Sequence, residues 1–443
     1  MKPQRERIFT DLAEIVSFNS VHSVPELVDE HQAAADWVVD KLSDAGLDVE
    51  AIDTIDGTRT IIGRKAPVGH APVVLLYSHY DVVPAGDPAL WTDDPFTLTE
   101  RDGRWYGRGT ADCKGNLVMH LEVLRLLEEY DGTDCGLIVL VEGSEEMGGE
   151  GLDHLIKTRP ELFEADAILI ADSGNAAVGV PTLTTMLRGG ARVSVTVDTL
   201  EAGVHSGQFG GAAPDAVAAL VRIMDSLRDE HGRTTIDGVD CLGTWDGEPY
   251  ERAAFRTDAG VLEGVQLMGT IDDEPADMVW SRPAVNFIGF TSTPVAEAIN
   301  AVPATATALL NLRVPPGMNS EEVASLLVAH IESHAPWGVK VTVDADDINP
   351  PFATDASKPA VKLLGECLVE AYGATSLATV GSGGSIPLTS ALQEAYPDAE
   401  IALFGVEEPQ CTIHSPDESV DPSEIEHIAV AEALFLQRYG KDQ

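Results

Sequence analysis

Two periodicities of apolar residues alternate along the first part of this 443-residue chain. Residues 5–18 and 28–46 carry apolar side chains at helical spacing, and Gly46 is placed to end the second helix. Short apolar runs follow, VVLLY, GLIVLVEG and DAILIAD, and an amphipathic helical stretch at 116–130 lies between the first two. This strand–helix–strand order predicts a mostly parallel sheet covered by helices.

The pattern changes near residue 185. Strand-like segments there alternate apolar and polar residues, as in RGGARVSVTVDT and at 307–316, which is typical of antiparallel strands with one exposed face. Helical stretches at 215–231 and 320–335 accompany them, and VKVTVDA predicts a further strand. After residue 352 the chain returns to a helix, a glycine-rich loop, the strand IALFGV and a final helix.

These changes predict an α/β protein in which a smaller domain interrupts a larger one. The larger domain, with helices on both faces of a mostly parallel sheet, would comprise residues 1–184 and 352–443, and a small α+β domain would occupy 185–351. The length agrees with two domains, because a single hydrophobic core rarely grows beyond about 250–300 residues.

The composition favours a cytoplasmic protein. Apolar runs are about as long as a strand, far shorter than the roughly 20 residues that a membrane helix needs. The charged start MKPQRERIFTDLAEIV lacks the apolar core of a secretory signal. Five cysteines are scattered along the chain without a CxxC pair, which is typical of reduced thiols in a cytoplasm. We therefore expect a cytoplasmic location and no membrane partner.

The formal net charge of −45 restricts the partners of the protein. Binding to nucleic acid phosphates needs clustered lysine and arginine, so we expect no nucleic acid partner. Two interpretations of the charge stay open: a solvated acidic surface that maintains solubility, and adaptation to a saline cytosol.

Acidic and imidazole side chains follow the apolar strands or lie in the loops near them: His79, Asp81, Asp112, Glu145, Glu146, Asp172 and His414. The carboxyl ends of parallel strands converge on one edge of a sheet, where ligand and catalytic groups collect. We therefore expect these residues to form one centre.

Their chemistry favours a centre with two divalent cations. Zinc accepts both imidazole and carboxylate ligands, and two adjacent metals polarise a carbonyl and activate a water together. Two close cations repel each other, which calls for a shared carboxylate, and Asp112 is the candidate. Asp81 would reach the second ring nitrogen of His79 and fix its tautomer. Of the adjacent Glu145 and Glu146, one would bind metal and the other would act as general base.

The motifs SHYDVVP, GRGTADCKG, EGSEEMGGEGL and ADSG, with the late His414, resemble a known family over nearly the whole chain. It is the zinc peptidase family of carnosinases, carboxypeptidases, aminoacylases and succinyl-diaminopimelate desuccinylase. The resemblance implies one metal on His79, Asp112 and Asp172, and a second on Asp112, Glu146 and His414.

The same resemblance implies further roles. Glu145 would be the general base, Asp81 would orient His79, and the Asp112–Cys113 peptide would be cis. In the family the smaller domain is a lid that forms a homodimer, and its histidine enters the partner's active site to stabilise the oxyanion. By that resemblance His205 would act in the partner subunit's site.

Carnosinase-type dipeptidases are the most similar members. GVHSGQFGG resembles their lid-domain histidine motif, AVPATATALLNLRVPP carries the counterpart of their substrate-binding arginine, Arg313, and GGSIP resembles their substrate loop, with Gly384 and Ser385. We expect Asn300 to reach the same pocket. These dipeptidases carry an arginine and an acidic residue before GGSIP, whereas this chain has Gly381 and Ser382. The departure leaves the preferred dipeptide open.

We therefore expect a dipeptidase with two divalent ions, zinc first and manganese or cobalt as alternatives, that hydrolyses dipeptides with a free amino terminus and a free carboxylate. Asp172 supports the free amino terminus, because carboxypeptidases and acylases of the family tend to have glutamate there. One alternative is an N-acyl amino acid deacylase or desuccinylase of the same family. Another is a metal-free homologue that serves as a binding or regulatory subunit.

Overall fold

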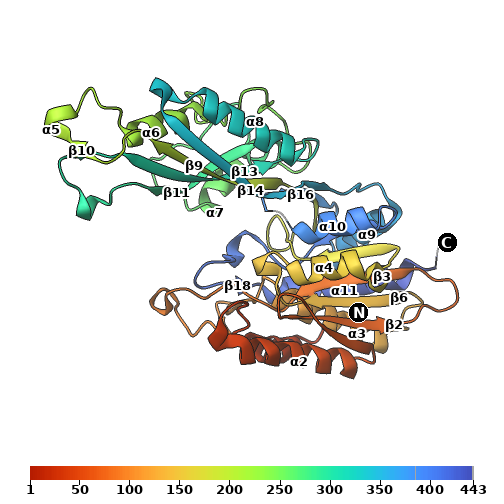
Figure 1. Cartoon of the computed structure of the whole chain (residues 1–443). Coiled ribbons are helices and arrows are strands. Elements are labelled where there is room, and N and C mark those ends of the chain that lie inside the picture. The colour runs from red at the N-terminus through yellow and green to blue at the C-terminus, as the bar shows by residue number, and fades with distance from the viewer. Residues whose placement is uncertain (385, 442–443) are drawn as a thin grey trace. The chain divides into compact units, whose positions relative to one another are not determined.

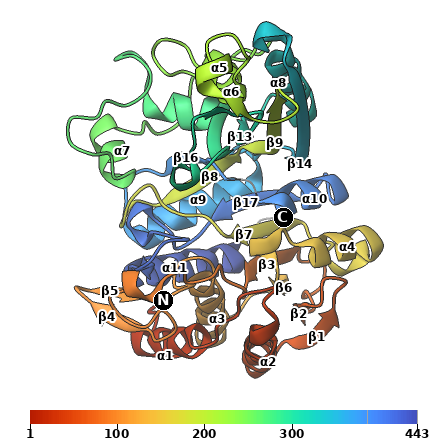
Figure 2. The same cartoon turned by 60° about the vertical axis from the view of Figure 1, so that its left-hand side comes forward.

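The computed structural model describes residues 1–384 and 386–441. Contacts divide them into two compact units, shown in Figures 1 and 2. The first comprises Met1–Thr185, Thr354–Val380 and the chain from Pro387 onward, and the second comprises Met186–Ala353 and the segment from Gly381 to Ile386. The sequence pattern placed that last segment in the larger domain. It belongs to the second unit because Arg188 N–H donates to the carbonyl of Ser382 and Gly381 packs against Trp280.

One large sheet forms the centre of the first unit. Its order is β1-β2-β6-β3-β7-β17-β8, and the strands are β1 (Asp48–Asp53), β2 (Arg59–Lys65), β3 (Val73–His79), β6 (Gly136–Glu142), β7 (Ala167–Ala171), β8 (Thr182–Leu187) and β17 (Glu400–Phe404). The short strands β15 (Phe352–Ala353) and β16 (Ala378–Ser382) pair with β8. The four central strands β6, β3, β7 and β17 are parallel, whereas β1, β2 and β8 pair antiparallel. The predicted α/β class is confirmed, with the parallel pairing confined to the centre of a mixed sheet.

Helices cover both faces of this sheet, which explains why its central strands are apolar throughout. The helices are α1 (Arg5–Val16), α2 (Val28–Asp44), α3 (Lys114–Glu129), α4 (Glu150–Thr158), α9 (Pro359–Tyr372), α10 (Pro387–Ala395) and α11 (Pro422–Arg438). Leu76 and Leu169 belong to the core cluster shared with α1, α2, α3, α9 and α11, while their neighbours Leu75 and Ile168 are buried outside that cluster. In Figures 1 and 2, α4 and α10 lie on the side opposite to α2 and α3.

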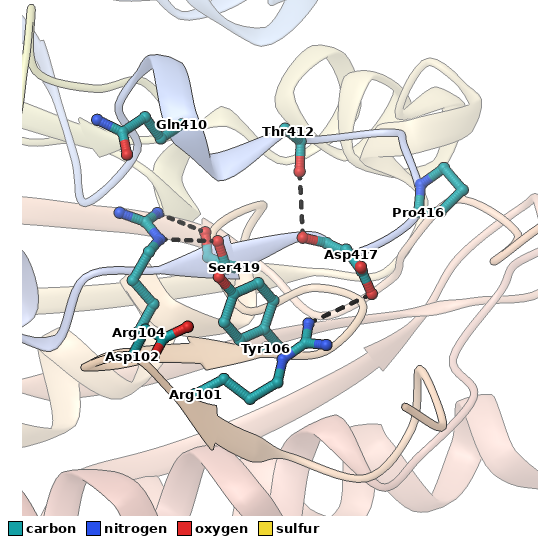
Figure 3. Close-up of a pocket in the computed structure, with 9 residues that line it drawn as sticks. All are labelled: Arg101, Asp102, Arg104, Tyr106, Gln410, Thr412, Pro416, Asp417 and Ser419. Atoms are coloured by element: carbon teal, nitrogen blue, oxygen red, sulfur yellow. Dashed lines mark hydrogen bonds and ion pairs between the residues drawn. The ribbon is translucent and has the colours of Figure 1, made fainter. Parts of the chain in front are cut away.

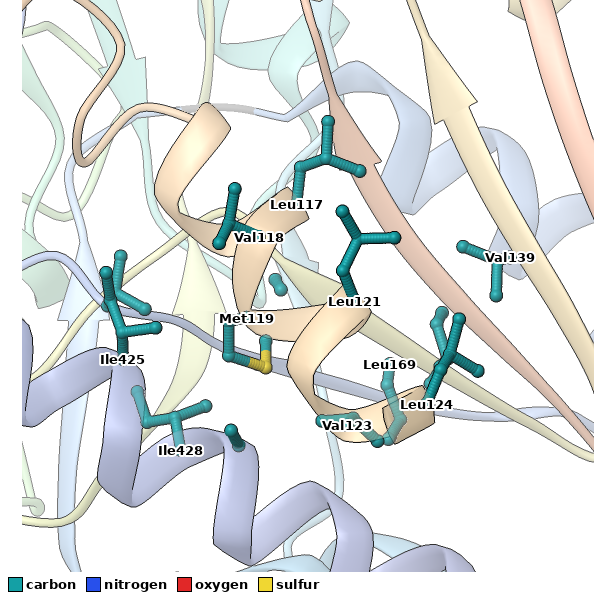
Figure 4. Close-up of a cluster of buried hydrophobic side chains, with 14 of the residues drawn as sticks. Leu117, Val118, Met119, Leu121, Val123, Leu124, Val139, Leu169, Ile425 and Ile428 are labelled. Carbon is teal, nitrogen blue, oxygen red and sulfur yellow. The ribbon is translucent and has the colours of Figure 1, made fainter. Parts of the chain in front are cut away.

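Helix α3 is apolar on most sides because it lies between the sheet and another helix. Leu121 and Leu124 face the strands that carry Val139 and Leu169, and Met119 lies toward Ile425 and Ile428 of α11 (Figure 4). The helix begins directly after Asp112 and Cys113. Its packing therefore fixes the position of the loop that carries Asp112.

A four-stranded antiparallel sheet forms the second unit, in the order β11-β13-β9-β14. Its strands are β9 (Gly189–Asp198), β11 (Ala284–Thr291), β13 (Thr305–Val314) and β14 (Lys340–Asn349), and its longer helices are α6 (Ala216–Ser226) and α8 (Ser320–Ser333). Alternate residues of β9 and β13 pack against both helices. Shorter elements complete the unit: β10 (Val204–His205), β12 (Ala301–Val302), α5 (Ser206–Phe209) and α7 (Arg252–Asp258).

His330 of α8 and His334, which directly follows the helix, have a spacing that suits a metal, and Asp237 lies nearby. Their rings stack at 4.0 Å, and His330 Nδ1 is 3.4 Å from the Asp237 carboxylate. However, His330 Nδ1 also accepts the Asp237 backbone N–H at 3.0 Å, and its Nε2 contacts Ser226 Oγ at 3.1 Å. Both ring nitrogens of His330 are thus engaged by the protein, which favours a packing role.

None of the helices within the described ranges combines the length and the apolar character that a membrane crossing needs.

Candidate metal centre

The ends of the central parallel strands bring the predicted residues together. His79 ends β3, and Asp172 directly follows β7, the neighbouring parallel strand. The N–H of Asp172 donates to the carbonyl of Phe404, the last residue of β17. Glu145 and Glu146 lie in a 3₁₀ turn, Glu145–Met147, just after β6. These groups therefore gather at the carboxyl edge of the parallel strands, as the strand order predicts.

One group of donors surrounds His79. Its Nε2 is 3.1 Å from Asp112 Oδ1 and 3.3 Å from Asp172 Oδ1. His79 is fully buried, and the side chain of Asp172 is only 8% exposed. Glu145 Oε2 lies farther from the same nitrogen, at 4.0 Å.

A second group surrounds His414. Its Nε2 is 3.0 Å from Asp112 Oδ2 and 3.1 Å from Glu146 Oε2. His414 has a left-handed backbone, with φ of 61°, which is uncommon for a residue other than glycine. The two oxygens of Asp112 therefore face different imidazoles. Asp112 is the one residue that both groups share.

The donor sets fit two metal ions. Ligands bound at about 2.0–2.1 Å in tetrahedral geometry lie roughly 3.3 Å apart, close to the separations in both groups. Glu146 Oε1 is buried and has no hydrogen-bond partner among the described residues, so a cation would satisfy it. The Asp112–Cys113 peptide is cis, as the resemblance implies. The ligand roles of these residues stay predictions that the geometry supports.

Asp81 lies behind His79, where the sequence predicts an orienting residue. His79 Nδ1 is 3.1 Å from the Asp81 carbonyl and 3.2 Å from Asp81 Oδ1. The same carboxylate accepts the backbone N–H groups of Glu145 and Glu146, at 3.2 and 3.1 Å. Asp81 thus holds the imidazole and the glutamate turn in fixed relation to each other.

Burial and like charges shape the electrostatics of the centre. Burial raises the pKa of Glu145 well above its usual range, and the charge of Asp172 adds to the effect. Burial also raises the pKa of Glu146 to about 6, although a hydrogen bond from His414 opposes the rise. Hydrogen bonds to Asp112 and Glu146 raise the pKa of His414 to about 10. Carboxylates crowded in this way favour the binding of cations.

Glu407 is a member of the centre that the sequence reasoning missed. One oxygen of its carboxylate lies within 4.8 Å of ligand atoms of Asp112 and Asp172. Its backbone is fixed by Gly174, where an added Cβ would lie 2.2 Å from the Glu407 carbonyl oxygen. Burial and the charges of Asp112 and Asp172 raise the pKa of Glu407 well above its usual range. The signal was present, since Glu407 follows the apolar run IALFGV just as the other acids follow their strands.

Glu418 supports the loop that carries Asp112, and it too was missed. Its buried carboxylate accepts N–H groups from Gly109, Ala111 and Asp112 at 3.0 to 3.2 Å, and it pairs with Arg108 at 2.6 Å. Glu418 follows His414 by four residues, so one carboxylate ties the two ligand-bearing loops together. Nothing in the local sequence indicates this long-range contact.

Glu418→Gln is therefore expected to weaken metal binding by roughly 10–100-fold, the range typical of outer-shell groups that orient ligands. The amide NH₂ of glutamine would meet backbone N–H groups or Arg108, so Asp112 would lose its fixed position. Competition with a chelator of known affinity measures the change. Glu424→Gln is the matched control, because Glu424 is also a buried acid that accepts the Gly179 N–H and the Tyr372 hydroxyl. Equal metal affinities in the two variants would contradict the positioning role.

A pocket of about 430 Å³ flanks the segment that contains His414 (Figure 3). The hairpin of β4 (Thr99–Arg101) and β5 (Arg104–Tyr106) lines one side, and residues of 410–419, including the short strand β18 (Ser419–Val420), line the other. Arg101 pairs with Asp417 at 3.4 Å, and Arg104 Nε donates to Ser419 Oγ at 2.9 Å. These two contacts anchor the C-terminal side of the His414 loop.

The remaining predicted residues lie in the second unit. His205 ends β10, opposite Ala301 of β12, and Ser206 N–H donates to the carbonyl of Asn300 at 2.9 Å. His205 and Asn300 are thus close to each other in space, and both are exposed. His205 Nδ1 accepts the Gly207 N–H at 3.1 Å.

The two predicted substrate elements, Arg313 and the glycine-rich loop, also belong to this unit. Arg313 is half-buried on β13, opposite Gly190 of β9. The N–H of Gly384 donates to Ser382 Oγ at 3.3 Å. Ser385 lies outside the described residues, so its predicted role stays a prediction.

Known proteins resemble the chain over its full length. The model of peptidase family M20/M25/M40 matches residues 75–438. Cysteinylglycine-S-conjugate dipeptidase of Corynebacterium striatum is 61% identical over 442 residues, which cover 100% of this chain and 97% of the relative. Cys-Gly metallodipeptidase dug1 of Schizosaccharomyces pombe is 30% identical and covers 74% of this chain and 73% of its own.

Solved structures show the same fold. The dipeptidase Dug1p of Saccharomyces cerevisiae has a TM-score of 0.82 at 24% identity, covering 99% of this chain and 96% of that one. Human carnosine dipeptidase 1 also has a TM-score of 0.82, at 22% identity, covering 98% and 96%. The match to the family model and the 61% identity to a full-length relative lead to one assignment: this chain belongs to peptidase family M20/M25/M40.

Proposed function

We propose that the protein is a metal-dependent dipeptidase with two divalent cations, zinc first, with manganese and cobalt as alternatives. The observation that carries the proposal is the pair of donor groups, around His79 and around His414, that share Asp112. The relatives named above as dipeptidases support the reaction. The name of the C. striatum protein supports S-substituted cysteinylglycine as the first substrate to assay.

The metal ions, when bound, would polarise the scissile carbonyl and lower the pKa of the attacking water. Glu145 would accept the proton of that water and pass it to the leaving amine. It is suited to this task because it lies next to both donor groups without belonging to either, and because burial raises its pKa. Asp81 would keep His79 in one tautomer throughout.

At the other end of the substrate, Arg313, Gly384 and Ser385 would bind the free carboxylate. A guanidinium forms two parallel hydrogen bonds with a carboxylate, which selects its planar shape. Asp172 would remain beside the free amino terminus of the substrate.

His205 would stabilise the developing oxyanion from the partner subunit of a homodimer, with Asn300 beside it. A donor directed at developing negative charge is often a large catalytic contribution. If so, Glu145→Gln and His205→Gln subunits, each inactive alone, are expected to recover activity when mixed. Random exchange gives roughly a quarter of the wild-type activity, since half of the dimers are mixed and each holds one complete site. Absence of recovery, in dimers shown by mass to have exchanged, would contradict the role in the partner subunit.

The experiment that tests the function is hydrolysis of one dipeptide supplied free, N-acetylated and C-amidated, by the metal-loaded protein. Cleavage of the free form alone supports a dipeptidase that recognises both termini. Preference for the acetylated form would instead support the deacylase alternative. A protein that binds no metal and cleaves none of the three would support a binding or regulatory subunit.

A cytoplasmic location remains part of the proposal. All five cysteines are free in the described structure, and four of them are buried, in agreement with reduced thiols.

A further inference from the structure

Arg188, at the start of the second unit, is a buried cation without a counterion. The residue is 7% exposed, and its Nε and Nη1 atoms have no hydrogen-bond partner within residues 1–384 and 386–441. No carboxylate of those residues lies within ion-pair distance of its guanidinium. A buried charge is strongly disfavoured unless a partner satisfies it. The environment of Arg188 therefore lacks an anion.

Other buried arginines of the chain are satisfied by the protein itself. Arg108, 1% exposed, pairs with Glu418 at 2.6 Å, and Arg282, 8% exposed, pairs with Asp273 at 2.6 Å. The half-buried Arg228, also without an acidic partner, donates instead to Thr234 and to the carbonyl of Val285. The missing partner of Arg188 is notable in a chain with 73 acidic and only 28 basic residues.

A second arginine adds to the positive charge. Arg188 directly precedes β9, and Arg313 of β13 pairs in register with Gly190, two residues farther along. Burial and the nearby charge of Arg313 lower the pKa of Arg188 to about 10, so it stays protonated at neutral pH. Burial also lowers the pKa of Arg313, which forms no ion pair within the described part of the chain. Two cations thus lie near each other, and of the two only Arg313 has an acidic residue, Asp347, near enough to offset part of its charge.

The glycine-rich loop leaves space next to this pair. Arg188 N–H donates to the carbonyl of Ser382 at 3.2 Å, which holds the loop beside the guanidinium. A Cβ at Gly383 would lie 3.0 Å from Arg188 Nη2, so a side chain there would crowd the group. Gly383 therefore keeps one face of the guanidinium open for a small planar ligand.

We propose that Arg188 and Arg313 together bind an organic carboxylate, the free carboxylate of the dipeptide. The inference rests on the proposed function and deepens it, because it adds a second guanidinium to the recognition of this end of the substrate. Two guanidinium groups offer enough N–H donors for both oxygens of the carboxylate. The carboxylate also supplies the negative charge that no protein group provides next to Arg188. Selection against C-amidated peptides follows directly, since an amide carries no charge and one acceptor oxygen fewer.

Arg188→Met tests the proposal. We expect kcat/KM for the free dipeptide to fall roughly 10²–10³-fold, mostly through KM, because charged hydrogen bonds are lost. For the residual hydrolysis of the C-amidated peptide the fall should be less than about 10-fold, since the amide offers the guanidinium no negative charge. The melting temperature is expected to stay the same or rise, because the arginine is unpaired in the free protein. Arg192→Gln, on the exposed face of β9, removes the same charge and should change none of these quantities.

Binding of inorganic phosphate distinguishes a site for the substrate carboxylate from a general anion site. Calorimetry with phosphate alone is expected to show binding to the wild type, competition with the free dipeptide, and loss of both in Arg188→Met. Phosphate that binds at Arg188 without competing would overturn the assignment to the substrate carboxylate. Equal loss of activity on both peptides with a lower melting temperature would show a structural arginine instead.

Unchanged discrimination between the free and amidated peptides in Arg188→Met of an active enzyme would overturn this inference alone. A wild-type protein that cleaves neither peptide would overturn the proposed function together with it.

Discussion

Glu145→Gln is expected to retain both metal ions and to lower kcat by roughly two to four orders of magnitude. Glutamine has nearly the same shape but accepts no proton, so only the proton transfer is removed. Retention of metal is expected because Glu145 belongs to neither donor group, and its carboxylate lies 4.0 Å from His79 Nε2, farther than the ligand contacts. Metal content by mass spectrometry and kcat on the free dipeptide measure the two effects.

Glu146→Gln is the matched control for this variant, since it changes the neighbouring residue of the same turn. Glu146 contacts His414 at 3.1 Å within the second donor group, so its loss should reduce metal content as well as rate. Near-normal turnover in Glu145→Gln would remove Glu145 from the role of general base. Metal loss in both variants would show that the two glutamates are both ligands.

Asp112→Asn is expected to have the other large effect, the loss of affinity for both ions together. The two oxygens of Asp112 face His79 and His414 at 3.1 and 3.0 Å, and no other residue is common to these two groups in the described structure. Asparagine removes the negative charge that reduces the repulsion between the two cations, and it replaces one donor oxygen by NH₂. The affinity for each ion should therefore fall by more than about 100-fold, beyond the range of outer-shell substitutions.

Asp81→Asn supplies the comparison for Asp112→Asn. Asp81 orients His79 and the glutamate turn without facing His414, so its substitution should weaken binding by only about 10–100-fold. Titration of the apo proteins with zinc against a chelator gives both affinities. Equal and small losses in the two variants would contradict the shared position of Asp112.

Local patterns in the sequence predict much of the fold and most of the centre. Apolar strands that end at His79 and Asp172 predict a shared edge, because a parallel sheet brings its carboxyl ends together. The change of periodicity near residue 185 predicts the antiparallel sheet of the second unit, which the structure confirms. The same reasoning could have included Glu407, which follows a strand in the same way.

Features that depend on contacts between distant segments are absent from those patterns. Glu418 supports Asp112 across more than 300 positions of sequence, and no periodicity indicates that contact. Arg188 lies next to an ordinary alternating strand, and only its burial without an anion marks it. The antiparallel strands at the margins of the large sheet are also hard to predict, because a strand such as β1 carries no continuous apolar run that would mark it in the sequence.

Metal titration of the apo protein, with hydrolysis of a free dipeptide followed at each step, tests the central claim most directly. Two equivalents of zinc or manganese are expected to bind per chain, and activity is expected to reach its maximum as the second is bound. Full activity with a single equivalent, or hydrolysis in the presence of excess chelator, would contradict a centre in which Asp112 serves two ions.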